Sequence, residues 1–325
     1  MPLRVLRLGT LVFVLALLGV SSMRPALGRP GDERARPNAA VDMRIAAEDA
    51  AMLGNDTRDA TAYLATSWYR DIQAMADAKH NDGRRAYLRE RLSADGFSVE
   101  SMPFKTRYGK GENLLVPVGG VPEASLLLIG AHTDRTRRGR GAADNGSGVA
   151  IAIALAQRLR ASPLRRHRVA LALWDMEEPG LFGAKAYITE RRERPALYVN
   201  LDVLAWGDTL WMMTPDPALA LVESSRIAAT AQGFAFRAEK RHPASDHLAF
   251  YDVDWPAVSY MLTDGSEIPS VLRAMAGEKV SFVPKLTATI HSHRDTLDKV
   301  EPAIVARAID ALEAALRDWD ANAAD

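Results

Sequence analysis

Strand-length apolar runs that alternate with helix-like segments constrain the fold of this chain more than any other feature. Strands are predicted at residues 97–104, 113–118, 125–130, 168–175, 198–202, 210–213 and 256–261. Helices are predicted at residues 46–74, 84–92, 148–159, 181–190, 216–232 and 302–318. Such an alternation is typical of a largely parallel sheet covered by helices on both faces. We therefore expect an α/β fold built as a single large domain.

Residues 1–28 are predicted to be an export signal rather than part of the fold. Arg4 and Arg7 supply a positive start, residues 8–20 are mostly apolar, and Gly28 belongs to a small-residue cleavage site. The apolar run is shorter than the roughly 20 residues of a membrane span, although an uncleaved anchor stays open as an alternative. We expect export to the periplasm or secretion, with no stable membrane association after signal cleavage.

The rest of the chain is predicted to divide into a flexible leader at residues 29–43 and a folded domain at residues 44–325. The chain has no Cys, which excludes disulfides and lipid attachment through an N-terminal Cys. Removing residues 1–28 takes away three of the 41 basic side chains and none of the 41 acidic ones, which leaves a net charge near −3. That balance gives no reason to expect nucleic acid or an anionic membrane as a partner.

Potential metal ligands lie at or near the ends of several predicted strands. The candidates are His132, Asp144, one of the adjacent pair Glu177 and Glu178, Asp202, and one of His291 and His293. Open α/β sheets place their sites at the carboxyl ends of the strands, where His132, the Glu pair and Asp202 are predicted to lie. Asp134 is a candidate acceptor for the second ring N–H of His132. Two imidazoles among carboxylates favour two zinc ions, with cobalt or manganese as lesser options, and indicate metal-assisted hydrolysis.

Each position taken alone also has a structural interpretation. A His after a strand is often only a hydrogen-bonding residue, and Asp144 in Ala-Asp-Asn-Gly-Ser-Gly suits a turn or helix cap. Of the two adjacent Glu residues, one is expected to bind metal while the other takes a proton from metal-bound water. One of His291 and His293 is expected to be a ligand, and Asp295 is a candidate for ordering that loop.

The ordered motifs resemble those of the co-catalytic di-zinc aminopeptidases of the bacterial leucyl aminopeptidase type. That superfamily also contains glutaminyl cyclases and transferrin-receptor-like proteins. The resemblance covers about residues 84–316 and rests on the motifs Gly-Glu-Asn-Leu-Leu, Gly-Ala-His-Thr-Asp, Gly-Ala-Ala-Asp-Asn-Gly-Ser-Gly, Glu-Glu-Pro-Gly-Leu-Phe-Gly-Ala, Asn-Leu-Asp, Ser-Asp-His-Leu-Ala-Phe and Ile-His-Ser-His-Arg-Asp-Thr. It implies a mixed, mostly parallel central sheet flanked by helices, the zinc exopeptidase (phosphorylase/hydrolase-like) fold.

Carried over by position, the resemblance implies a role for each candidate. The implied metal ligands are His132 and Asp202 on one zinc, Glu178 and His291 on the other, and Asp144 bridging both. Glu177 becomes the general base and Asp134 the partner of His132. His291 is preferred over His293 because the family's ligand directly follows the apolar residue of that motif.

Three features have no assigned role. Residues 135–140 carry four Arg, which form either a solvated loop or a rim that shapes substrate choice. The resemblance implies a Tyr that supports the scissile carbonyl in some relatives, and Tyr260 and Tyr251 are both candidates for it by position. The run Ser245-Asp246-His247 either lines the pocket or caps a turn.

The favoured function is a monomeric, exported aminopeptidase that acts on peptides with a free N-terminus, using a metal-bound hydroxide prepared by Glu177. The main alternative is a glutaminyl cyclase, although those enzymes carry Trp before the last His ligand, where this chain has Ile290. A receptor-like binding module, a carboxypeptidase and a dipeptidase are further alternatives. The preferred N-terminal residue does not follow from the sequence.

Overall fold

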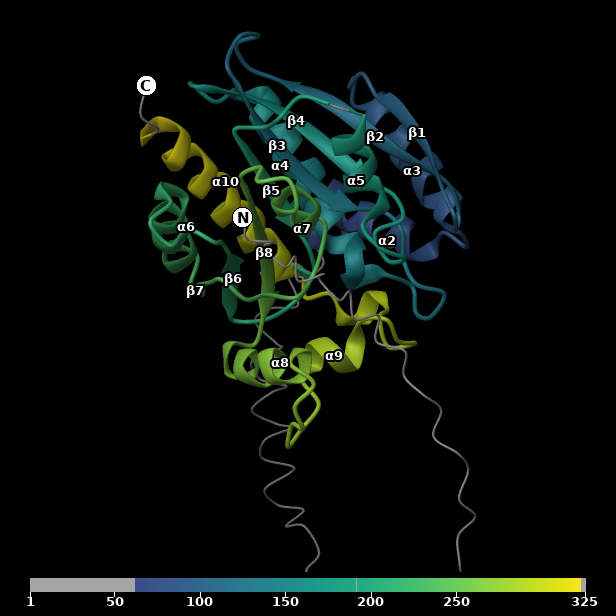
Figure 1. The fold of residues 1–325 in the computed structure, drawn as a ribbon, viewed down its shortest axis with the longest axis vertical. Coiled ribbons are helices and arrows are strands. Elements are labelled where there is room, and N and C mark those ends of the chain that lie inside the picture. Colours follow the sequence, from purple (N-terminus) through teal and green to yellow (C-terminus); the bar gives the residue numbers. More distant parts are fainter. Residues whose placement is uncertain (1–61, 191, 323–325) are drawn as a thin grey trace, which may run out of the picture. The chain divides into compact units, whose positions relative to one another are not determined.

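An eight-stranded sheet forms the centre of the protein in a computed structural model, which describes residues 62–190 and 192–322 (Figure 1). The strand order is β1-β2-β4-β3-β5-β8-β6-β7. The strands are β1 (Glu100–Thr106), β2 (Gly109–Gly119), β3 (Ser125–His132), β4 (His167–Trp174), β5 (Leu197–Leu201), β6 (Thr209–Met213), β7 (Ala235–Glu239) and β8 (Ala257–Thr263). The export signal and the leader predicted at residues 1–43 lie outside the described residues.

Parallel pairing dominates the middle of this sheet. Strand β3 pairs in parallel with β4 and with β5, and β5 pairs in parallel with β8. Antiparallel pairs join β1 to β2, β2 to β4 and β6 to β8, while the edge strand β7 runs parallel to β6. The predicted mixed, mostly parallel sheet is therefore confirmed. Three central strands, β3, β4 and β5, end at the same edge, and that edge carries the polar residues of the site.

Helices cover both faces of the sheet, as predicted (Figure 1). Strand residues alternate between the faces: Leu127 and Ile129 of β3 join the larger core with α4, whereas Leu126 and Leu128 join the smaller core beneath α5 and α7. The helices are α2 (Ser67–Asp77), α3 (Asn81–Ala94), α4 (Gly148–Ala161), α5 (Phe182–Thr189), α6 (Ala220–Ala231), α7 (His247–Tyr251), α8 (Ile268–Met275), α9 (Lys285–Thr289) and α10 (Pro302–Asn322). In the described part of the chain, no helix has the length and apolar character needed to span a bilayer.

Some element boundaries differ from the predictions. The helix predicted at residues 46–74 is confirmed over most of its described part, residues 62–74, but it is interrupted at residues 65 and 66. Helix α2 begins at Ser67, where the Thr66 hydroxyl accepts a hydrogen bond from the Tyr69 N–H. Asp216 does not cap α6. Its carboxylate accepts the Ala218 N–H in a separate turn, and the helix begins at Ala220. Strand β7 and the short helices α7, α8 and α9 were not predicted, because none of them is long enough to show a clear periodicity.

Candidate metal centre

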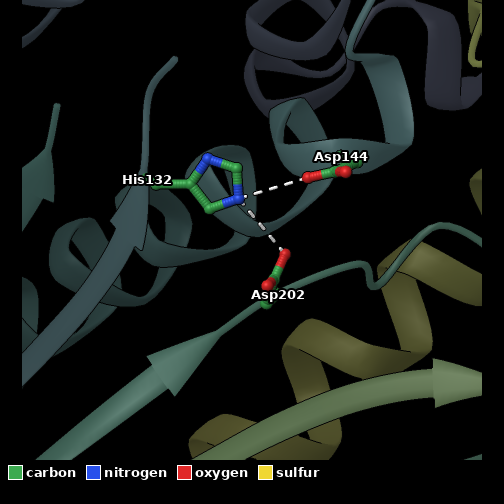
Figure 2. A group of neighbouring side chains, drawn as sticks. All are labelled: His132, Asp144 and Asp202. Carbon is green, nitrogen blue, oxygen red and sulfur yellow. Dashed lines mark ion pairs between the residues drawn. The ribbon is translucent and has the colours of Figure 1, made fainter. Parts of the chain in front are cut away.

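Strand ends bring the first donor residues together. His132 is the last residue of β3, and Asp202 directly follows β5, which lies beside β3. The irregular turn η1 (Ala142–Ser147), which leads into α4, carries Asp144 to the same place. The His132 Nε2 atom lies 3.2 Å from Asp144 Oδ1 and 3.5 Å from Asp202 Oδ1 (Figure 2). All three side chains are buried, and their donor atoms fit within a span of 4.8 Å.

A second donor set lies on the other side of Asp144. The His291 Nε2 atom is 3.1 Å from Asp144 Oδ2 and 3.0 Å from Glu178 Oε2. The Asp144 carboxylate therefore faces one imidazole with each of its oxygens. The His291 side chain is 56% exposed, whereas that of His132 is 1% exposed. The two sets thus share a buried carboxylate, but only the second opens to solvent.

The hydrogen bonding of these groups fits a cation better than it fits an ordinary polar network. Asp202 Oδ1 is buried and has no hydrogen-bond partner among the described residues. A neutral imidazole has only one ring proton to donate, so neither His can satisfy both carboxylates that lie beside its Nε2 atom. Buried carboxylates that converge without compensating donors are costly unless a positive charge joins them. Two imidazole nitrogens and three carboxylates form a donor set that suits zinc.

The pKa shifts of the second set show the same concentration of negative charge. Burial and the neighbouring Asp144 charge raise the pKa of Glu178 to about 7. Hydrogen bonds with Asp144 and Glu178 raise the pKa of His291 to about 11. Burial raises the pKa of Glu177 well above its usual value, and nearby carboxylates add to that rise. A bound cation reverses this situation, because it favours the carboxylates in their charged form and the imidazoles in their neutral form.

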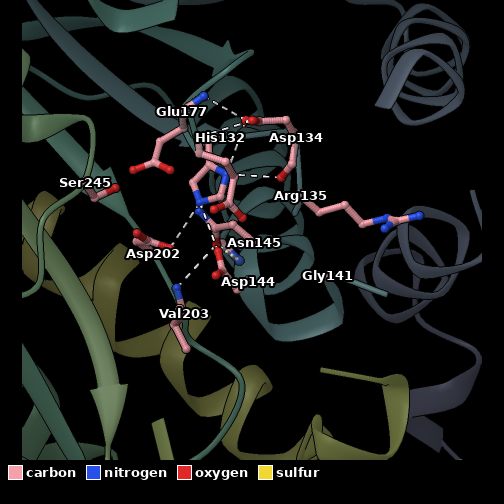
Figure 3. Close-up of polar contacts among 12 residues, drawn as sticks. His132, Asp134, Arg135, Gly141, Asp144, Asn145, Glu177, Asp202, Val203 and Ser245 are labelled. Atoms are coloured by element: carbon pink, nitrogen blue, oxygen red, sulfur yellow. Dashed lines mark hydrogen bonds and ion pairs between the residues drawn. The ribbon is translucent and has the colours of Figure 1, made fainter. Parts of the chain in front are cut away.

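Asp134 fixes the segment that carries the two Glu residues. Its carboxylate accepts hydrogen bonds from the backbone N–H groups of Glu177, at 2.9 Å, and Glu178, at 3.2 Å (Figure 3). The His132 Nδ1 atom lies 3.2 Å from the Asp134 carbonyl oxygen and 3.6 Å from its carboxylate. Asp134 thus contacts His132 through both its backbone and its side chain, while its carboxylate orients the Glu pair.

Two other side chains hold the turn that carries Asp144. The Asp295 carboxylate accepts hydrogen bonds from the N–H groups of Ala143, at 2.8 Å, and Asp144, at 3.2 Å. The Asn145 amide donates to the Leu201 carbonyl at 2.8 Å, so it ties this turn to the end of β5. Asp295 was expected to order its own loop, which carries His291, but its carboxylate instead holds the turn that carries Asp144. Asn145 was missed, although its position directly after Asp144 was a usable signal.

A buried arginine lies beneath the same turn. Arg84 of α3 is fully buried and donates a hydrogen bond to the Gly141 carbonyl at 2.7 Å. Burial lowers the pKa of Arg84 to about 10, although the surrounding carboxylates oppose that effect. The burial of Arg84 was not predicted, because an Arg near the start of a polar helix gives no signal of burial.

Left-handed backbone is concentrated beside the donor residues. Met176 precedes the Glu pair with φ 58°, Val203 follows Asp202 with φ 56°, and His291 itself has φ 57°. Such conformations are strained for residues other than Gly, and they cluster at functional sites. The strain here accompanies sharp changes of chain direction that turn donor side chains toward one point.

The structure also places the residues that the sequence analysis left open. His293 is exposed and belongs to neither donor set, whereas His291 belongs to the second. The Tyr260 hydroxyl pairs with Ser225 at 2.6 Å, and the Tyr251 hydroxyl donates to the Ala257 carbonyl at 2.5 Å. Neither Tyr is thereby assigned to a scissile carbonyl. In the run Ser245-Asp246-His247, Asp246 lies directly before α7 and is fully buried. Neither of its carboxylate oxygens has a hydrogen-bond partner among the described residues.

The fold and the donor cluster at the carboxyl ends of its strands define an α/β metallopeptidase. Within that class, the chain belongs to peptidase family M28, whose family model matches residues 113–316. This confirms the resemblance drawn from the motifs.

Individual proteins support the same placement. A probable lipoprotein aminopeptidase of Mycobacterium tuberculosis is 36% identical over 114 residues, which cover 34% of this chain and 23% of that protein. This chain therefore matches only a part of its curated relative. Zinc aminopeptidase BSAP of Bacillus subtilis superposes with a TM-score of 0.52 at 22% identity, covering 65% of this chain and 51% of that one. Porphyromonas gingivalis glutaminyl cyclase superposes with a TM-score of 0.63 at 16% identity, covering 78% and 97%. At these identities, the structural likeness establishes the fold alone.

Proposed function

We propose that this chain is an exported, zinc-dependent aminopeptidase that removes N-terminal residues from peptides. The observation that carries the proposal is the Asp144 carboxylate shared between the His132 and His291 donor sets. A single carboxylate between two imidazole-containing sets is the arrangement that two neighbouring cations require. Membership of a peptidase family and a curated relative named an aminopeptidase favour peptide bonds as the target.

Five residues would hold two zinc ions. His132 and Asp202 would bind one ion, Glu178 and His291 the other, and Asp144 would bridge them. When bound, the ions would polarise the scissile carbonyl and lower the pKa of a water molecule toward neutrality. Asp134 keeps the Glu pair in place through its two backbone hydrogen bonds, so that neighbouring Glu residues can take different roles.

Glu177 is the proposed general base. It is a neighbour of the ligand Glu178 but belongs to neither donor set, and it lies beside His132 and Asp202 (Figure 3). A carboxylate free of metal in this position can take a proton from the attacking water and deliver it to the leaving amine.

Export is part of the proposal and rests on the sequence of residues 1–28. The Mycobacterium tuberculosis relative is described as a lipoprotein. The present chain has no Cys, so any attachment would have to differ from Cys-linked lipid. We propose a periplasmic or secreted, monomeric enzyme for peptides with a free N-terminus.

The proposal is tested by mass spectrometry of a mixed peptide set incubated with the zinc-loaded protein. Stepwise loss of N-terminal residues, abolished by a chelator, is the expected result. Ammonia loss confined to peptides that begin with Gln would instead make the protein a glutaminyl cyclase, whose fold is shared. Peptides that stay intact with zinc bound would contradict both activities.

Glu177→Gln tests the base within the same assay. Loss of a positioned general base typically lowers the rate about 10²- to 10⁴-fold. We expect a kcat loss of that size with the zinc content unchanged, because Glu177 is not in a donor set. Glu190→Gln, at the exposed end of α5, is the matched control and should behave as wild type. An active Glu177→Gln variant would rule out this base.

A further inference from the structure

Two loops meet at the solvent-facing side of the donor sets. Residues 135–140 connect His132 to the turn that carries Asp144, and residues 291–295 begin with His291. The Arg140 N–H donates to the Asp295 carbonyl at 2.7 Å. A Cβ atom at Gly139 would lie only 2.2 Å from the Ser292 carbonyl oxygen, so the two backbones are in close contact.

Three arginines on these loops are exposed and unpaired in the part of the chain that the structure describes. Arg137, Arg138 and Arg294 are exposed, and within residues 62–190 and 192–322 their side chains make no hydrogen bond or ion pair. Arg135 differs, since its guanidinium donates to carbonyls of Lys79, Thr136 and Gly139, and it extends away from the donor residues (Figure 3). We call Arg137, Arg138 and Arg294 the cationic rim.

None of the acids in the described part of the chain forms an ion pair with the cationic rim. The Asp295 carboxylate is buried and occupied by two backbone N–H groups. Asp77 pairs with Arg140, and Asp298 pairs with Lys299. Many other exposed arginines do have acidic partners, as Arg273 has in Glu278 at 3.0 Å. The two loops therefore carry three positive charges that no acid of the described residues pairs with.

The backbone segments that carry the cationic rim adjoin the donor sets. The Thr136 N–H donates to Glu178 Oε1 at 3.1 Å, and Arg137 is the next residue. Arg294 lies three residues after His291, the most exposed of the donor residues. A peptide held by its N-terminal residue extends outward after the scissile bond. At about 3.5 Å per residue, the carboxylate of a dipeptide or tripeptide stays within roughly 10 Å of that bond.

We propose that the cationic rim is a recognition subsite for a carboxylate that lies after the scissile bond. The preferred substrates are short peptides with a free C-terminal carboxylate, or peptides with an acidic side chain directly after the N-terminal residue. This inference rests on the proposed aminopeptidase function and names its substrate class. Exposed charges interact weakly one by one but act together over the Debye length of about 8 Å at physiological ionic strength.

Two matched substrate pairs separate the two sources of the carboxylate. Leu-Gly against Leu-Gly-amide tests the C-terminal carboxylate, and Leu-Asp-amide against Leu-Asn-amide tests the acidic side chain. We expect the wild-type kcat/KM to be roughly fivefold higher for the charged member of at least one pair, chiefly through KM. In the variant R137Q/R138Q/R294Q, that ratio should fall to about one, and 0.5 M NaCl should lower the wild-type ratio.

Arg165→Gln provides the control. Arg165 is exposed like the rim residues but precedes β4, at the opposite edge of the sheet. It should keep the wild-type ratio. A wild-type ratio near one for both pairs, or a ratio that survives the triple substitution, would overturn the subsite.

A binding measurement keeps this test separate from the activity. Calorimetry of the same peptides with zinc-loaded Glu177→Gln, with and without the three Arg substitutions, gives the affinity ratio without turnover. If wild type hydrolyses no peptide while the affinity ratio depends on the arginines, the aminopeptidase fails and the subsite stands. If peptides are hydrolysed but the affinity ratio does not change with the three Arg substitutions, the proposed subsite is wrong while the aminopeptidase function stands.

Discussion

Buried carboxylates lie at both edges of the central sheet, and their surroundings are opposite in character. One edge, which we call the amino edge, is where the central strands β3, β4 and β5 begin. There, Asp320 of α10 accepts hydrogen bonds from the backbone N–H groups of Arg165, Arg166 and His167 at 2.6 to 3.1 Å. The His167 ring Nδ1 atom lies 2.8 Å from the same carboxylate. Its oxygens are thus occupied by donors of the protein itself.

At the carboxyl edge, where β3, β4 and β5 end, the carboxylates of the two donor sets face one another and two imidazoles instead. Asp202 Oδ1 has no hydrogen-bond partner among the described residues, and both Asp144 oxygens point at His nitrogens that are shared with other acids. Burial thus does not distinguish a structural carboxylate from a candidate metal ligand. The distinction lies in whether backbone donors fill the oxygens or leave them for a cation.

The strongest test of this difference is Asp144→Asn, which keeps the shape but removes the shared charge. An amide cannot bridge two cations through two anionic oxygens, so we expect the zinc content to fall from two ions to less than one. Since a metal supplies several kcal/mol of transition-state stabilisation, peptide hydrolysis should fall about a thousandfold or more. Elemental analysis and kcat/KM give the result. Two retained ions would contradict the bridging role.

Removing the metal from the wild-type protein should have the next largest effect. At a free zinc concentration a thousandfold above the Kd, each bound ion adds about 4 kcal/mol to the free energy of unfolding. Chelation should therefore lower the Tm of wild type by many degrees, while Asp144→Asn should respond little. Differential scanning calorimetry measures both. Equal Tm values with and without zinc would argue that the carboxyl edge is as self-sufficient as the amino edge.

The comparison of edges also explains what the sequence could predict. His132 is the last residue of β3, and Asp202 directly follows β5. Because apolar runs of strand length are easy to recognise, the parallel topology predicted that these two residues would meet at one edge. His291 follows α9 with a left-handed backbone, and no periodicity predicts where such a loop returns. Its place rested on the family resemblance.

Support from distant parts of the chain was harder to foresee. Arg84 and Asp295 reach the Asp144 turn from segments 57 and 151 or more residues away. Local propensity carries no information about such contacts, since they form only after the sheet has brought the segments together. The same reasoning applies to β7, a short edge strand whose pairing with β6 depends on tertiary context.

The two donor sets themselves offer a smaller contrast within the carboxyl edge. His291 is exposed while His132 is buried, so a chelator should reach the second set first. We expect wild type to lose zinc in two kinetic phases. His291→Asn should bind one ion and lose the fast phase. Its Tm should fall less than that of His132→Asn, because the latter substitution replaces a buried side chain. Stopped-flow measurements with a coloured chelator follow the phases, and a single phase for both ions would contradict the assignment.

The smallest effect on zinc is expected from Asp320→Asn, at the amino edge. The substituted amide keeps one acceptor oxygen but turns its NH₂ toward backbone N–H groups, so at least one charge-assisted hydrogen bond is lost. Such bonds contribute about 1.5–3 kcal/mol, and urea denaturation should show that the free energy of unfolding falls by that amount.

The eight residues of β4 separate Asp320 from the donor edge by roughly 25 Å. Zinc content and kcat/KM should therefore stay within about twofold of wild type, because changes at separated sites with no shared partners are independent. A variant that folded but lost zinc would show that the two edges are coupled, and that the filling of oxygens by backbone donors does not by itself mark a carboxylate as structural.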